Sequence, residues 1–119
     1  MRPWEYFFTQ NLYYMEIIIN SLNFKTGTAL EEFVREKVSK LFTQCDKIIR
    51  AHVVLRESEN GAPENKLCEI RLVIPGNDHF VRKCTGVYEK SILQAVEGLQ
   101  KIIRREKIKT IRKRYFQYL

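Results

Sequence analysis

The sequence has no paired cysteines, no metal-ligand motif and no long apolar run. Its three cysteines, Cys45, Cys68 and Cys84, form no C-x-x-C pair, and their odd number is typical of free thiols in a reducing cytoplasm. The two histidines, His52 and His79, are too few and too far apart to predict a zinc site. Because no stretch of about eighteen apolar residues occurs, the sequence predicts no membrane-spanning helix.

The sequence also has few features of a catalytic site. It contains no G-x-S-x-G, no glycine-rich phosphate loop and no His-x-x-x-His. Cys45 would need a base to act as a nucleophile, and His52 or His79 could supply it only through the fold. Cys68 and Cys84 lie within strand patterns, which indicates packed side chains. We therefore expect no enzyme activity, no cofactor, no metal ion and no small-molecule substrate.

The positive charge of the chain is concentrated near its end. The 119 residues suit one domain with a hydrophobic core, and their formal net charge is +7. Residues 101–114 contain eight Lys or Arg and one Glu, which gives +7, whereas residues 1–100 contain thirteen charged residues of each sign. Such an excess attracts a polyanion such as RNA, DNA or an acidic membrane. The plainer alternative is a solvated helix end without a partner.

The segment from Tyr88 to Arg114 is predicted to form one long helix. Apolar residues recur at three- and four-residue spacing in its first half, which is typical of a helix lying on a core: Tyr88, Ile92, Ala95, Val96, Leu99, Ile102 and Ile103. Ile108 and Ile111 fall outside this apolar arc. A helix from Tyr88 to Glu106 is about 28 Å long, and a strand of six or seven residues spans only about 20–23 Å. The basic end is therefore expected to extend beyond the sheet.

The remaining elements give the order β-α-β-β-β-α. Strands are predicted at Glu16–Phe24, Ile48–Glu57, Lys66–Ile74 and His79–Gly86, and a first helix at Thr28–Gln44 with Leu30, Val34, Val38 and Leu41 on its core face. The residues from Thr28 to Glu31 match a capping box at the start of this helix. We expect an α+β fold in which a four-stranded sheet carries both helices on one face. This order resembles a double-stranded RNA-binding domain with an extra N-terminal strand.

Aromatic residues mark both ends of the chain. Residues 1–14 hold six of the fourteen aromatic residues. We interpret this segment as an extension upstream of a natural start at Met15; the alternative is an aromatic segment that covers the sheet or a partner. Residues 15–114 are then expected to form a single domain. Residues 115–119 form an aromatic tail, which either stacks on bases or packs back on the sheet.

Four stretches resemble the short-form ribosome hibernation-promoting factors, which are also called ribosome-associated inhibitor or ribosomal subunit interface proteins and belong to the sigma-54 modulation protein family. These stretches are Met15–Ile19, Leu30–Leu41, Asp46–Ile48 and Tyr88–Ile92 with the basic segment that follows. The resemblance covers Met15 to about Lys113. It implies the β-α-β-β-β-α fold and a bacterial, cytoplasmic stress-response protein that regulates translation through ribosome hibernation.

The resemblance also implies a binding site for ribosomal RNA. Members of the family bind the small ribosomal subunit in the channel for messenger and transfer RNA, through basic residues of both helices. The implied RNA-binding residues are Lys37 and Lys40 in the first helix and Lys101, Arg105, Lys107 and Lys109 in the second, to which Arg104 is added for its position and Arg82 and Lys83 as lesser candidates on the fourth strand. Inhibition would be steric and would need no chemistry. Since the long-form dimerisation domain does not follow residue 119, we expect a monomer.

A second hypothesis is a protein-interaction module that regulates transcription. It would use the exposed face of the sheet rather than the basic helices, with Glu69, Arg71, Val73, His52, Val54 and Arg56 as contacts. Generic binding of double-stranded RNA is a third hypothesis, which only the shared α-β-β-β-α core supports. A partner that is lost on ribonuclease treatment and at high salt would favour the first hypothesis over the second.

Overall fold

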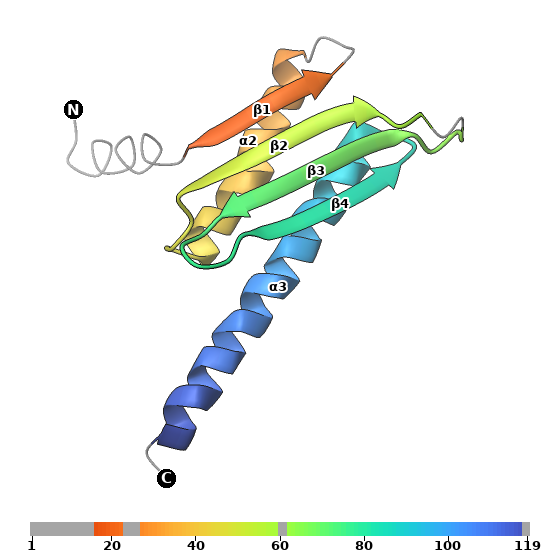
Figure 1. The fold of residues 1–119 in the computed structure, drawn as a ribbon. Coiled ribbons are helices and arrows are strands. Elements are labelled where there is room, and N and C mark those ends of the chain that lie inside the picture. Colours follow the sequence, from red (N-terminus) through yellow and green to blue (C-terminus); the bar gives the residue numbers. More distant parts are fainter. Residues whose placement is uncertain (1–15, 23–26, 60–61, 118–119) are drawn as a thin grey trace, which may run out of the picture.

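The computed structural model describes residues 16–22, 27–59 and 62–117 (Figure 1). The chain forms β1 (Ile17–Leu22), α2 (Thr28–Gln44), β2 (Arg50–Glu57), β3 (Lys66–Val73), β4 (His79–Thr85) and α3 (Tyr88–Gln117). The predicted order β-α-β-β-β-α and the α+β class are confirmed. The segment of residues 1–14 lies outside the described residues, as do residues 118–119 of the aromatic tail.

The described strands form a four-stranded sheet in the order β1-β2-β3-β4. β1 pairs in parallel with β2, with Ile17 opposite Ala51, because α2 crosses between them. β2, β3 and β4 pair antiparallel. A turn joins β3 to β4, in which the Asn77 amide donates to the Ile74 carbonyl at 3.3 Å and Gly76 has a φ of 94°. Since Gly76 follows Pro75 and adopts a positive φ, this is a type II turn.

Both described helices lie on one face of the sheet (Figure 1). The core is formed by the predicted apolar stripes of both helices and by alternate residues of the strands, among them Val34, Val38, Leu41, Ala51, Val53, Leu55, Cys68, Ile70, Leu72, Ile92, Ala95, Leu99 and Ile103. Gly98 allows α3 to lie close to β4, because a Cβ atom at this position would meet Val81 Cγ1 at 3.3 Å. The predicted core faces are therefore confirmed.

The predicted capping box at the start of α2 is wrong. Gly27 occupies the N-cap position with an extended backbone, and no side chain caps the helix. The Glu31 amide already donates to the Gly27 carbonyl at 3.1 Å. Thr28 is consequently the first helical residue, so its hydroxyl is placed one position too late to accept from the Glu31 amide.

A buried polar cluster fixes the start of α3. The Ser91 hydroxyl donates to the Lys66 carbonyl at 2.6 Å and lies 2.7 Å from the Thr85 hydroxyl. Ser91 is fully buried and Thr85 almost so. The cluster joins β3, the end of β4 and the first turn of α3, so it helps to set the direction in which the long helix leaves the sheet.

Candidate nucleic-acid interface

The basic end of α3 extends beyond the sheet. In Figure 1 the second half of this helix, coloured blue, runs past the strands into open space. Ile103 is only 2% exposed and is the last buried residue of α3 among those whose exposure is described. Every residue from 104 to 116 is exposed. The predicted overhang is therefore confirmed, and we refer to residues 104–117 as the α3 overhang.

Four cations form a stripe along one side of α3. Lys101, Arg105, Lys109 and Arg112 follow one another at spacings of four, four and three residues, and all four are exposed. Residues at these spacings lie on the same side of a helix. Lys109 Nζ lies 3.6 Å from Glu106 Oε1, but an exposed ion pair of this length leaves the charge available to a partner. We call these four residues the cation stripe.

Arg104 and Lys107 lie outside the cation stripe. The Lys107 ammonium donates to the Gln44 carbonyl at the end of α2, so this side chain turns back toward the domain. Arg104 is exposed on the flank that also carries Ile108 and Tyr115. The predicted set therefore does not form one surface, and Arg112, which the sequence analysis left out, belongs with Lys101, Arg105 and Lys109. The helical spacing alone was enough to find it.

The two lysines predicted on α2 differ in their surroundings. Lys37 Nζ lies 5.5 Å from the centre of the Phe33 ring and 3.6 Å from Glu36 Oε1, and its side chain is half-buried. Lys40 is exposed. The end of α2 meets the middle of α3, where the Gln44 side-chain amide donates to the Gln100 carbonyl at 3.3 Å. This contact holds the end of α2, four residues after Lys40, against the residue of α3 that precedes Lys101.

Arg82 and Lys83 lie apart from the helical cations. As neighbours in β4 they point to opposite faces of the sheet. Arg82 Nε lies 2.9 Å from Glu69 Oε1, and the same carboxylate oxygen lies 3.4 Å from Arg56 Nη2. Glu69 thus compensates part of the charge of both arginines. Lys83 is exposed on β4, one of the two edge strands of the described sheet, opposite the buried Cys68.

The open face of the sheet carries an aromatic residue that the sequence analysis missed. Phe80 is 44% exposed, and its ring centre lies 5.4 Å from the Arg71 guanidinium carbon and 6.0 Å from that of Arg82. The alternation of β4 placed Phe80 on this face, but nothing in the sequence showed that two arginines would flank it. Leu67 lies on the same face and is nevertheless buried.

The Cys, His, Asp and Glu side chains of the described residues form no metal site. No three of them gather in a way that could hold a metal ion. Burial raises the pKa of the Cys68 thiol to about 12, so this sulfur is a packed thiol at neutral pH. Within the same part of the chain, no helix is long and apolar enough to cross a membrane.

A family model matches most of the chain. This model, described as "Sigma 54 modulation protein / S30EA ribosomal protein", matches residues 17–111. The chain belongs to this family. The resemblance inferred from the sequence is thereby confirmed, and it ties the chain to the ribosome-associated modulation and interface proteins. Lys101, Arg105 and Lys109 lie inside the matched range, whereas Arg112 and the aromatic end of α3 follow it.

Solved structures of ribosome-associated proteins share the fold of this member of the sigma 54 modulation and S30EA family. The N-terminal domain of Protein Y from Thermus thermophilus is 25% identical, with a TM-score of 0.65, and the match covers 76% of this chain and 98% of that one. A ribosomal subunit interface protein from Coxiella burnetii is 16% identical, with a TM-score of 0.69, and the match covers 79% and 99%. No curated protein matches the sequence.

Proposed function

We propose that this protein silences idle ribosomes by binding ribosomal RNA in the messenger and transfer RNA channel of the small subunit. The observation that carries the proposal is the α3 overhang, which has a net charge of +6 and in which every residue from 104 to 116 is exposed. Phosphate groups of RNA are the partner that such a surface attracts most strongly. Membership of a ribosome-associated family supports the ribosome as the source of that RNA.

The cation stripe is the main contact surface in this proposal. Lys101, Arg105, Lys109 and Arg112 span about 16 Å along the helix, a length that reaches several phosphates of one RNA strand. Lys40 and the half-buried Lys37 add a second row on α2, and Arg104 adds charge on the flank of the overhang. Arg82 and Lys83 are lesser contacts, since Glu69 compensates Arg82.

In this proposal the protein inhibits translation by occupying space in the channel, and no chemical reaction is needed. Residues 15–114 act in this proposal as one ribosome-binding domain, which works in the cytoplasm as a monomer. The helical overhang enters the channel, and the sheet fills the space beside it. Messenger and transfer RNA are excluded because they need the same space. Folded RNA is recognised mainly through its shape and its phosphates, so the protein needs no base-specific motif.

Co-sedimentation with purified small subunits tests the proposal. We expect the chain to sediment with the subunits at 50 mM salt, to be released progressively as salt rises, and to be blocked by messenger and transfer RNA bound beforehand. Release by salt without any competition from messenger and transfer RNA would place the protein outside the channel. Absence of binding at low salt would remove the ribosome from the proposal.

The open sheet face supports a second candidate, a protein-interaction module that regulates transcription. Phe80 is an exposed aromatic between two arginines, and aromatic and arginine residues are common at protein interfaces. The face is less charged than the overhang because Glu69 compensates Arg56 and Arg82. A partner that stays bound after ribonuclease treatment and is lost in Phe80→Ala would favour this candidate.

A further inference from the structure

A cavity of about 390 Å³ lies where α3 leaves the sheet. Three segments that are far apart in the sequence form its walls: the connection of residues 45–47 between α2 and β2, the β3–β4 turn with the start of β4, and the side of α3 that carries Ile103, Lys107 and Ile111. Cavities that hold small ligands measure about 300–1,000 Å³. The size therefore suits a single small ligand group.

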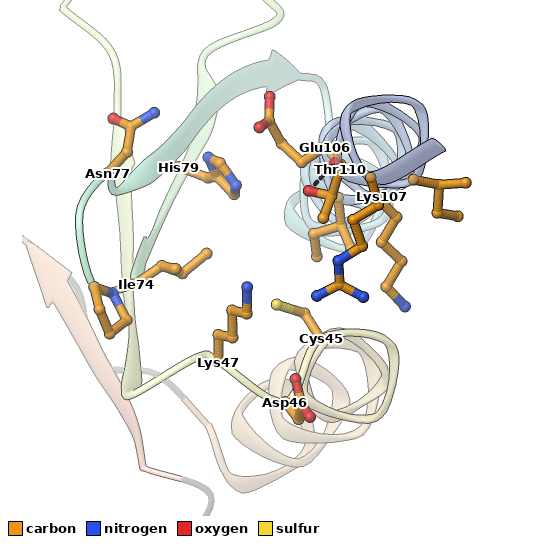
Figure 2. Close-up of a pocket in the computed structure, with 13 residues that line it drawn as sticks. Cys45, Asp46, Lys47, Ile74, Asn77, His79, Glu106, Lys107 and Thr110 are labelled. Atoms are coloured by element: carbon orange, nitrogen blue, oxygen red, sulfur yellow. Dashed lines mark hydrogen bonds between the residues drawn. The ribbon is translucent and has the colours of Figure 1, made fainter. Parts of the chain in front are cut away.

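The cavity combines an apolar floor with a cationic rim. Figure 2 shows the Cys45 thiol, the Ile74 side chain, the His79 ring and the Lys47 ammonium pointing into the same space. Lys107 and Arg114 line the cavity from α3. Three cations and two carboxylates, Asp46 and Glu106, give the lining a net charge of +1 with histidine neutral. A free phosphate alone would leave the apolar floor unused, and a hydrocarbon alone would leave the cations unused.

We propose that this cavity receives one unstacked nucleotide of the bound RNA, with the base on the apolar floor and the phosphate at the cationic rim. Single-stranded RNA is recognised by bases that leave the stack and lie against side chains. Ile74 and Ile111 offer apolar surface to such a base, and the His79 ring offers a stacking partner. Lys47 and Arg114 reach the phosphate. The inference rests on the proposed RNA binding and adds the place where a base is held.

The position of the cavity supports RNA as the source of the nucleotide. Its α3 wall includes Glu106, Lys107, Thr110 and Ile111, which belong to the overhang. The cation stripe lies on the opposite side of the same helix turns, since residues 107 and 111 are turned by about 200–240° from residue 105 at 100° per residue. RNA that surrounds the overhang therefore passes the cavity mouth. A free nucleotide carries the same chemistry, and the experiment separates the two sources.

The experiment uses the full chain with ¹³C-labelled isoleucine methyl groups. We expect AMP and a single-stranded A6 RNA to shift the methyl resonances of Ile74 and Ile111 through the ring current of the base. Ribose 5-phosphate at the same concentration should leave them in place. Equal shifts with ribose 5-phosphate, or no shift with AMP and A6, would overturn the proposal. Shifts with AMP but not with A6 would overturn RNA as the source.

Two variants of the overhang provide the matched comparison. Thr110→Trp fills the cavity from its α3 wall, whereas Ile108→Trp adds the same ring to an exposed position outside the lining. We expect T110W to abolish the AMP shift at Ile74 and to weaken A6 binding by about fivefold, the lower end of the loss for one stacked base. I108W should keep the shift, and equal behaviour of the two variants would contradict the proposal. The methyl shifts are measured without ribosomes. Methyl shifts without co-sedimentation would therefore count against the proposed function alone, and co-sedimentation without methyl shifts would count against the cavity proposal alone.

Discussion

Removal of the cation stripe should change how strongly salt weakens ribosome binding. The variant replaces Lys101, Arg105 and Lys109 by Gln, which deletes three exposed charges within about 12 Å of helix. Each phosphate that a cation neutralises contributes about 0.7–0.9 to the slope of log affinity against log salt. The slope should therefore fall by about 2–2.7 in the variant, if each of the three side chains contacts one phosphate.

The expected size of the effect is large enough to measure by co-sedimentation with small subunits between 50 and 200 mM salt. Over this range a slope difference of 2–2.7 means that the wild type loses about 15- to 40-fold more affinity than the variant. At 50 mM salt the variant should already bind more weakly. Its stability should stay within about 0.5 kcal/mol of the wild type, because all three side chains are exposed.

A second triple variant controls for net charge. Arg35, Arg71 and Lys90 are exposed on α2, β3 and the first turn of α3, and their replacement by Gln lowers the charge by the same three units. We expect this control to keep a slope close to that of the wild type. Equal slopes in the two triple variants would show that only total charge matters, and a wild-type slope in the stripe variant would refute the contact surface.

Two further predictions concern the scaffold. Ser91→Ala removes the donor to the Lys66 carbonyl and a partner of Thr85 in a buried site, so it should cost about 1–3 kcal/mol. Thermal unfolding should show a clear fall in Tm, and a fall no larger than that of Ser39→Ala, whose hydroxyl bonds on the surface, would contradict the role of the cluster. The second prediction follows from the pKa of Cys68, which burial raises from 9.0 to about 12. Above pH 9 the unfolded thiol ionises while the folded thiol stays protonated, so stability should fall by about 1.4 kcal/mol per pH unit up to about pH 12. Urea unfolding at pH 8–11 measures this slope, and an unchanged slope in Cys68→Ala would show that another group causes it.

The fold was predictable because its apolar periodicities are regular. The spacing of Val34, Val38 and Leu41 on α2 and the alternation of Cys68 and Ile70 on β3 were enough to orient these elements toward one core. The capping box failed because the match to Thr28 and Glu31 did not fix the residue at which the helix begins. The Gly27 carbonyl accepts from the Glu31 amide and so moves the start by one position.

The candidate interface was predictable only in part. The charge of the overhang and the exposure of Ile108 and Ile111 follow from the sequence of α3 alone. Compensation of Arg82 by Glu69 depends on the pairing of β3 with β4, which no local pattern shows. The cavity is harder still to predict from the sequence. Its lining residues Cys45, Ile74 and Ile111 come together only through the order of the strands and the direction of α3.

If the protein binds RNA as proposed, the overhang gives a short domain more than one side for that contact. A helix that lies on a sheet along its whole length can offer only its outer half to a partner, because its inner half is buried. Beyond Ile103 no described residue of α3 is buried, so the cation stripe and the cavity wall are accessible from opposite directions. RNA segments bound on the two sides would not compete for the same atoms.

The core loses no apolar contact in this arrangement. The apolar residues of α3 that pack on the sheet end at Ile103, and the charged residues of the overhang follow them. This separation of packing and binding along a single helix explains why nearly all of the excess charge of the chain can lie in one segment without weakening the fold.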